Sequence, residues 1–129
     1  MMNDKIKIWV SRVFAGFIAL SLTATALMKI AGVPPQMVEG ISRAGIPRTD
    51  VIPIAILELS CLVLYLIPRT MVLGAVLLTG YFGGAIAVHL IGKQSVFPVI
   101  LIGLWVWAGI YFRVPALQSL LPLRIKEKS

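Results

Sequence analysis

Four long hydrophobic stretches follow one another along the chain, separated by short polar or proline-containing segments. They span residues 8–30, 51–67, 71–91 and 96–112. Each is long enough to cross a bilayer as a helix, although the second and fourth lie at the short limit of about 17 residues. Backbone groups in lipid must be hydrogen-bonded within their own segment, so helices are the only open-ended structures that can span it. The pattern predicts an all-α integral membrane protein, a bundle of four transmembrane helices.

The segment between the first two stretches, residues 31–50, has a pattern of its own. It opens with Pro34 and Pro35, and Gly45 follows its apolar positions. Proline favours the first turn of a helix, and apolar residues at helical spacing favour an amphipathic one. The segment therefore predicts a short amphipathic helix at the membrane interface, between helices one and two. Its apolar positions are Met37, Val38, Ile41 and Ala44.

Composition supports the membrane interpretation. The chain has 129 residues, of which 59% are hydrophobic and 13% charged, and its mean hydropathy is +0.97. Soluble domains carry about 25% charged residues. We expect residues 1–129 to form a single membrane domain.

The first stretch should stay as a helix rather than be cleaved as a signal peptide, because its apolar run continues past Ala24 and Ala26 to Ile30.

The net charge of +7 points to lipid headgroups rather than nucleic acid, because the basic residues flank the apolar stretches and form no basic stripe. We expect membrane lipids as partners, together with a membrane partner subunit or a second copy of the chain. The basic tail, residues 124–129, is expected to rest on anionic lipid.

An even number of spans places both termini and the loop between helices two and three on one side. That side holds eight basic residues and the other holds four, so both termini are expected in the cytoplasm. Arg12, Arg69 and Arg113 fall near the predicted cytoplasmic boundary, where their side chains can reach the headgroups. The eight are Lys5, Lys7, Arg12, Arg69, Arg113, Arg124, Lys126 and Lys128, and the four are Lys29, Arg43, Arg48 and Lys93.

Glu58 is the acidic residue whose charge would cost the most free energy to bury in the membrane. It stands seven residues into the second stretch, about 10 Å along a helix at 1.5 Å per residue. A carboxyl group there must be protonated or paired. Antiparallel helices bring Lys29 and His89 to the same depth, in the outer half of the bundle. The three residues predict a ligand or proton site; the alternative is a structural Glu58–Lys29 ion pair with His89 facing the interface.

Other polar and small residues accompany this trio. Cys61 and Tyr65 share a helical face with Glu58, and we expect them, with Tyr81 on the next helix, to line the site. Small residues on the third helix predict close packing of the transmembrane helices against one another. These packing residues are Ala75, Thr79, Gly80, Gly83 and Gly84.

Familiar catalytic sets do not occur in the sequence. One cysteine and one histidine cannot form an intrachain disulfide or a protein-only zinc site. There is no nucleophile elbow, no zinc-protease motif and no phosphate loop. We therefore predict no catalytic residues and no metal site, and expect a binding or accessory protein rather than an enzyme.

Several motifs together resemble the DoxX-like family of small bacterial membrane proteins. They are Arg12, Gly16 and Lys29 on helix one, "LEL" around Glu58, "YLIPRT", and "GAVLLTGYFGGAIAVHL". The resemblance runs from about Arg12 to Arg113. It implies a four-helix fold in the bacterial inner membrane, and Glu58, Arg69 and His89 as family-pattern positions.

The family takes its name from a subunit associated with archaeal thiosulfate:quinone oxidoreductase, and this chain has no cysteine pair of its own. If the protein has a redox role, we therefore expect it to be at most an accessory subunit of a membrane oxidoreductase. Our leading hypothesis is an accessory or binding protein whose polar site holds a quinone-like amphiphile or a proton. The alternatives are a small-solute transporter or lipid-binding protein, and a purely structural partner subunit.

Overall fold

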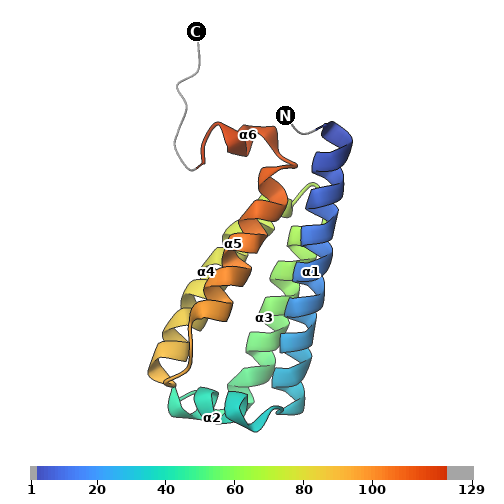
Figure 1. The fold of residues 1–129 in the computed structure, drawn as a ribbon. Helices are drawn as coiled ribbons and strands as arrows, with labels where there is room; N and C mark the ends of the chain where they lie inside the picture. Colours follow the sequence, from blue (N-terminus) through green and yellow to red (C-terminus); the bar gives the residue numbers. More distant parts are fainter. Residues whose placement is uncertain (1–2, 122–129) are drawn as a thin grey trace.

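The computed structural model describes residues 3–121, and all of its regular structure there is helical (Figure 1). Three helices are long and apolar enough to cross a membrane by length and composition, and a fourth apolar helix is shorter. The predicted all-α class is therefore confirmed. The long helices are α1 (Asp4–Ala31), α3 (Arg48–Leu66) and α4 (Met71–Ile91), and the shorter one is α5 (Phe97–Tyr111). Two further helices are α2 (Pro35–Arg43) and α6 (Pro115–Gln118).

The four apolar helices run side by side as a ring (Figure 1). Helix α1 packs against α3 and α5, and α4 packs against the same two, so α1 and α4 lie diagonally opposite each other. Helix α2 crosses one end of the bundle, and α6 lies at the other end near the N-terminus. We call these the α2 end and the α6 end. The last turns of α1 and α4 and the first turn of α3 all lie at the α2 end.

Local sequence explains where these helices begin and end. The Asn3 side chain accepts a hydrogen bond from the Lys5 amide and caps α1. Gly32, with φ of 74°, closes α1 by donating its amide to the Met28 and Lys29 carbonyls. Proline at the first position opens α2, as predicted. Helix α3 begins at Arg48, three residues before the predicted start, and α6 was not predicted.

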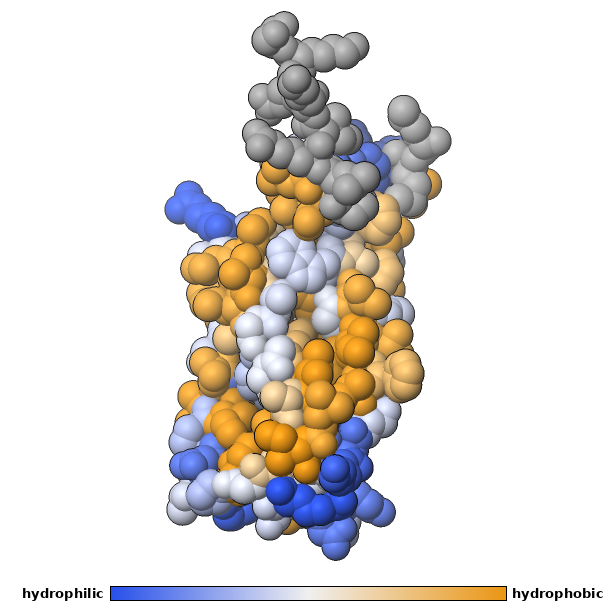
Figure 2. Space-filling model, turned by 90° about the vertical axis from the view of Figure 1, so that its left-hand side faces the viewer, coloured by the Kyte–Doolittle hydropathy of each residue, from blue (hydrophilic) through white to orange (hydrophobic). Residues whose placement is uncertain are grey.

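The interior of the ring is mostly apolar, and so is much of its outside. Exposed leucines such as Leu20 and Leu104 cover the outer surface. Figure 2 shows hydrophobic residues over the middle of one face and hydrophilic residues gathered at the α2 end. A chain with this surface is a multi-pass membrane protein. The largest fully buried apolar side chains are Ile18, Leu22, Leu78, Ile110, Val51 and Val106.

Helices α3 and α4 touch closely at the α6 end and diverge toward the α2 end (Figure 1). A Cβ atom on Gly74 would meet the backbone of Tyr65, so the two helices are in backbone contact there. At Gly80, Gly83 and Gly84, a Cβ atom would meet nothing within 4 Å. The prediction that these three glycines pack helices within the chain is therefore wrong. At Gly80 and Gly84, α4 has already moved away from α3, and Gly83 is exposed.

The other two predicted packing residues do lie against neighbours. Ala75 is fully buried in the core. The hydroxyl of Thr79 accepts a hydrogen bond of 2.8 Å from the indole of Trp107 on α5 and donates to the Ala75 carbonyl. The hydrogen bond from Trp107 ties α5 to α4.

The predicted boundary arginines all lie toward the α6 end. Arg12 and Arg69 are exposed, and Arg113 is half-buried just beyond α5. Their reach to headgroups stays a prediction. The basic tail expected to rest on lipid lies outside the described residues.

Gly74 and Gly83 offer a matched test of the close contact. We expect Gly74→Ala to lower the free energy of unfolding by about 1–3 kcal/mol, the usual cost of overpacking. Gly83→Ala, on the same helix but in open space, should cost nothing measurable. The measurement is unfolding of both variants in detergent, followed by circular dichroism. Equal stability of the two variants would contradict the close approach at Gly74.

Candidate functional site

A fully buried carboxylate stands at the centre of a network that joins three helices. Glu58 on α3 is 0% exposed, and its two oxygens are engaged by neighbouring side chains. The Lys29 ammonium on α1 lies 2.6 Å from Oε2, and the Tyr81 hydroxyl on α4 donates to the same oxygen over 2.9 Å. Thr25 donates to Oε1 over 2.6 Å. The carboxylate is therefore paired and hydrogen-bonded, as a charge in lipid must be.

The placement of these groups follows from helix geometry. Thr25 and Lys29 are four residues apart and so share one face of α1. Ala26 and Ala55 are both fully buried, and their small side chains let α1 and α3 approach at the level of Glu58. Lys29 lies in the last turn of α1, where the helix dipole favours a cation.

Tyr81 closes the network across the diagonal of the bundle. Its hydroxyl accepts a hydrogen bond of 2.8 Å from Lys29 while donating to Glu58. The ammonium also lies 5.4 Å from the centre of the Tyr81 ring, within range of a cation–π interaction. A single side chain of α4 therefore contacts both partners of the α1–α3 ion pair.

Arg48 holds the end of α1 in place. Its guanidinium donates to the carbonyl oxygens of Lys29 and Ile30, each over 2.8 Å. Carbonyls in the last turn of a helix lack amide partners four residues on, and the Lys29 carbonyl has only a long bond from the Gly32 amide. The arginine therefore adds donors to both carbonyls and ties the start of α3 to the end of α1. In the sequence, Arg48 counts only as one of the basic residues on the side opposite the termini. Nothing local links it to Lys29 and Ile30, which lie 19 and 18 positions away.

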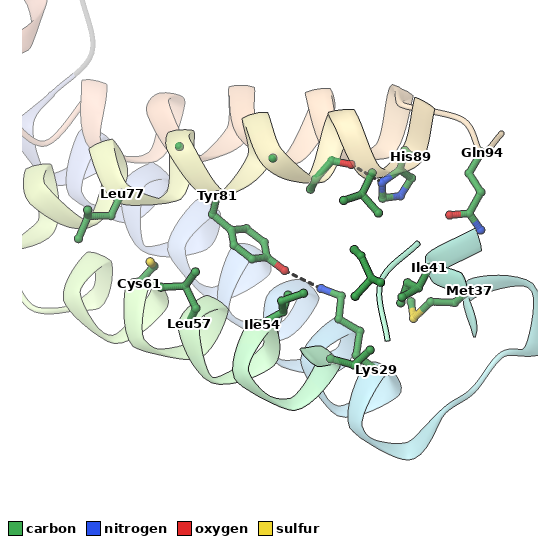
Figure 3. Close-up of a pocket in the computed structure, with 16 residues that line it drawn as sticks. Lys29, Met37, Ile41, Ile54, Leu57, Cys61, Leu77, Tyr81, His89 and Gln94 are labelled. Atoms are coloured by element: carbon green, nitrogen blue, oxygen red, sulfur yellow. Dashed lines mark hydrogen bonds between the residues drawn. The ribbon is translucent and has the colours of Figure 1, made fainter. Parts of the chain in front are cut away.

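Beside the network, a cavity of about 530 Å³ occupies the space between the diverging helices α3 and α4 (Figure 3). Helix α2 borders it at one end, and its walls are mostly apolar. Lys29 and Tyr81 face the cavity, whereas Glu58 lies behind them and does not line it. The other lining residues are Met37 and Ile41 of α2, Ile46, Val51, Ile54, Leu57 and Cys61 of α3 and the loop before it, Leu77, Gly80, Gly84, Ala85, Val88 and His89 of α4, and Gln94.

Two of the glycines explain why the space is empty. Gly80 and Gly84 lie on the cavity-facing side of α4, on either side of Tyr81 along the chain. Since a Cβ atom at either position would meet nothing within 4 Å, each has room for a side chain that the sequence does not supply. The cavity is thus a consequence of the diverging helices and of glycine at these two positions.

His89 lies on the same wall but does not complete the predicted trio. Its Nδ1 atom is 2.7 Å from the Ala85 carbonyl oxygen of its own helix (Figure 3). A carbonyl can only accept, so Nδ1 carries the proton, and Nε2 of the neutral ring is left as an acceptor. The structure brings Lys29 and Glu58 into contact, and places His89 beside the cavity that Lys29 also lines.

Helix α2 is fastened to the α4–α5 loop. The Gln94 amide donates to the Gln36 carbonyl over 2.8 Å, and a Cβ atom on Gly92 would meet the Gly40 carbonyl oxygen. This close contact lets α2 lie across the end of the bundle and turn Met37 and Ile41 toward the cavity (Figure 3). The apolar side of α2, the predicted amphipathic helix, thus faces the cavity inside the bundle.

The predicted secondary lining divides in two. Cys61 is buried and lines the cavity, as does Tyr81. Tyr65 does not: its hydroxyl donates to the Val106 carbonyl of α5 over 2.8 Å, in the core beyond the cavity. The lining prediction is therefore wrong for Tyr65, because the side chain is long enough to cross to α5 where α3 and α4 are closest.

The groups at the cavity can bind and orient a ligand, and can hold a proton. Lys29 offers an ammonium, Tyr81 a hydroxyl and His89 an imidazole. Within residues 3–121, no cluster of three or more histidine, cysteine or acidic side chains could hold a metal ion. All buried side-chain polar atoms in that part of the chain have hydrogen-bond partners.

Apolar helices of membrane length around a buried ion pair define a small multi-pass membrane protein. The chain matches the DoxX-like family over residues 13–110 and belongs to that family. The matched range includes every residue of the Glu58 network and the lining residues on α2, α3 and α4. Comparison with curated proteins and with solved structures gives no match.

Removing either partner of the ion pair should cost more than removing both. Lys29→Met leaves a carboxylate with 0% exposure uncompensated, and breaking a buried pair in this way costs about 3–5 kcal/mol. Glu58→Gln should cost less, because the Lys29 side chain keeps 18% exposure. The double variant leaves no unpaired charge and should recover much of the loss.

A double-mutant cycle in detergent checks this, with the free energy of unfolding measured for all four proteins. Strictly additive losses would show that the two side chains do not interact.

Proposed function

We propose that the protein binds a small amphiphile in the cavity between α3 and α4. The apolar part of the ligand lies between the two helices, and its polar headgroup reaches Lys29, Tyr81 and His89. A quinone-like headgroup suits these residues. The observation that carries the proposal is a cavity of about 530 Å³ whose apolar walls lead to the exposed side of a buried polar network. Its volume falls within the range of small-molecule sites, about 300–1,000 Å³.

Hydrogen-bonding capacity supports a headgroup that contains oxygen. The Lys29 ammonium has three donors, and its recorded bonds to Glu58 and Tyr81 use two. The third can donate to a quinone carbonyl. Nε2 of a neutral His89 can accept from the hydroxyl of the reduced form. The proposed role is therefore binding, in an accessory subunit, with no catalytic step assigned to this chain.

The position of the cavity favours binding over transport. Its lining on α3 and α4 extends no further toward the α6 end than Cys61 and Leu77. Beyond them, Tyr65 and its contact with α5 fill the bundle. A solute path through the protein would need to pass this packed half. A purely structural role stays a competing proposal, because the polar network also fixes the positions of α1, α3 and α4.

We also propose that the protein lies in the bacterial cytoplasmic membrane with both termini in the cytoplasm. The distribution of basic residues along the chain supports this orientation. The cavity then lies in the outer half of the bilayer, where an amphiphile can reach it from surrounding lipid. A membrane partner subunit or a second copy could accept or deliver the ligand.

Filling the cavity tests the binding proposal. The probe is a long-chain benzoquinone with a photoreactive diazirine in its tail, added to the protein in lipid nanodiscs and mapped by mass spectrometry after illumination. We expect labelled peptides from α3 and α4 in the wild-type protein. Gly84→Leu places a side chain in the cavity and should reduce that labelling about tenfold, the effect of about 1.4 kcal/mol.

Gly83→Leu is the matched control, because Gly83 has equal room but does not line the cavity. It should label as the wild type does. His89→Gln should reduce labelling if the headgroup contacts the ring. Labelling of Gly84→Leu at the wild-type level would overturn the proposal, and a wild type labelled only at lipid-facing positions would favour the structural role.

A further inference from the structure

We infer that Glu58, although it does not touch the cavity, determines which headgroups the cavity accepts. By neutralising Lys29 it selects amphiphiles with uncharged hydroxyl or carbonyl headgroups and excludes carboxylates. The inference rests on the proposed function and narrows it to a ligand class. It also gives Glu58 a role distinct from ligand contact or proton uptake.

Lys29 supplies the charge that faces the cavity. Of the described lining residues, only Lys29 is a lysine, arginine, aspartate or glutamate. A lone ammonium at the end of an apolar cavity would be a good site for a fatty carboxylate, because charge-assisted hydrogen bonds are about twice as strong as neutral ones. Lys29 alone would therefore make this a fatty-acid site.

Glu58 cancels the charge of Lys29. Glu58 lies 2.6 Å from the ammonium and is shielded completely from solvent. Thr25 and Tyr81 donate to its two oxygens, so the carboxylate is held on three sides and cannot turn away from Lys29. An anionic headgroup would bring a second negative charge to the same ammonium, in surroundings where like charges repel strongly.

Few hydrogen-bonding groups at the cavity remain unused. Tyr81 already accepts from Lys29 and donates to Glu58. Lys29 keeps one donor, and the His89 ring keeps one acceptor when neutral. A hydroxyl can use both and a carbonyl can use the first. An ionised carboxylate gains the same single donor but must be stripped of water to reach it.

Other cations at the α2 end do not alter this balance. Arg48 is bound to the backbone carbonyls of α1, and Arg43 lies 3.8 Å from Glu39 on the exposed side of α2. Lys93 is exposed beyond the end of α4. None of these three lines the cavity. The charge that a headgroup meets is therefore set by Lys29 and Glu58.

Competition between matched ligands tests the inference. A diazirine-bearing long-chain alcohol labels the protein in nanodiscs, and unlabelled competitors of equal chain length carry an alcohol, a methyl ketone or an ionised carboxylate. We expect the alcohol and ketone to compete in the wild type, and the carboxylate to compete at least about tenfold more weakly. In Glu58→Gln the preference should shift toward the carboxylate by about tenfold or more.

Two further variants are matched controls. Thr25→Val removes a hydrogen bond to Glu58 but keeps its charge, so the wild-type preference should persist. The double variant Lys29→Met with Glu58→Gln removes the ammonium, so the gain in carboxylate binding should disappear. If Glu58→Gln does not fold, Glu58→Met provides a second neutral replacement. It should shift the preference toward the carboxylate in the same way.

The outcomes separate the two proposals. Equal competition by alcohol and carboxylate in the wild type overturns the charge selectivity, as does an unchanged preference in the folded Glu58 variants. In both cases amphiphile binding itself stands. If none of the three amphiphiles reduces labelling of α3 and α4, the binding proposal fails as well.

Discussion

The arrangement of the helices depends on the contacts that hold the buried carboxylate of Glu58. Glu58 is completely buried, so its charge must be met by groups within the bundle. Lys29, Thr25 and Tyr81 meet it, and they come from helices far apart in the sequence. In lipid, hydrophobic contact between helices gives little specificity, because the tails are as apolar as leucine. The hydrogen bonds and the ion pair of the polar network therefore determine much of how α1, α3 and α4 pack together.

The cavity and the network depend on each other through α4. This helix is pressed against α3 at Gly74 and moves away from it toward the α2 end. Tyr81 bridges the widening space to reach Lys29 and Glu58. Gly80 and Gly84 leave the space beside it empty. A Cβ atom at either position would meet nothing within 4 Å, so the contacts of the bundle do not themselves require glycine there.

The sequence could predict the depth of the site better than its contacts. Hydropathy placed α4 within its observed limits, and antiparallel order placed Lys29 and Glu58 at one level. Thr25 could have been added, since it lies four residues before Lys29 on the same face. The bridge by Tyr81 could not, because it crosses the bundle diagonal. The glycines were misassigned for a related reason: a row of small residues marks either close packing or empty space, and only the divergence of α3 and α4 decides which.

A structural ion pair and a ligand site need not be alternatives here. The same Lys29 ammonium that neutralises Glu58 also lines the cavity, and its bonds to Glu58 and Tyr81 leave one donor unused. In the proposed binding mode, the groups that hold the carboxylate therefore also set the charge and the hydrogen bonds that a headgroup meets. An unpaired ammonium at the end of an apolar cavity would attract anionic amphiphiles, and an anionic bilayer supplies these in excess. Under the proposal, one interaction thus serves both the stability of the bundle and the selectivity of the cavity.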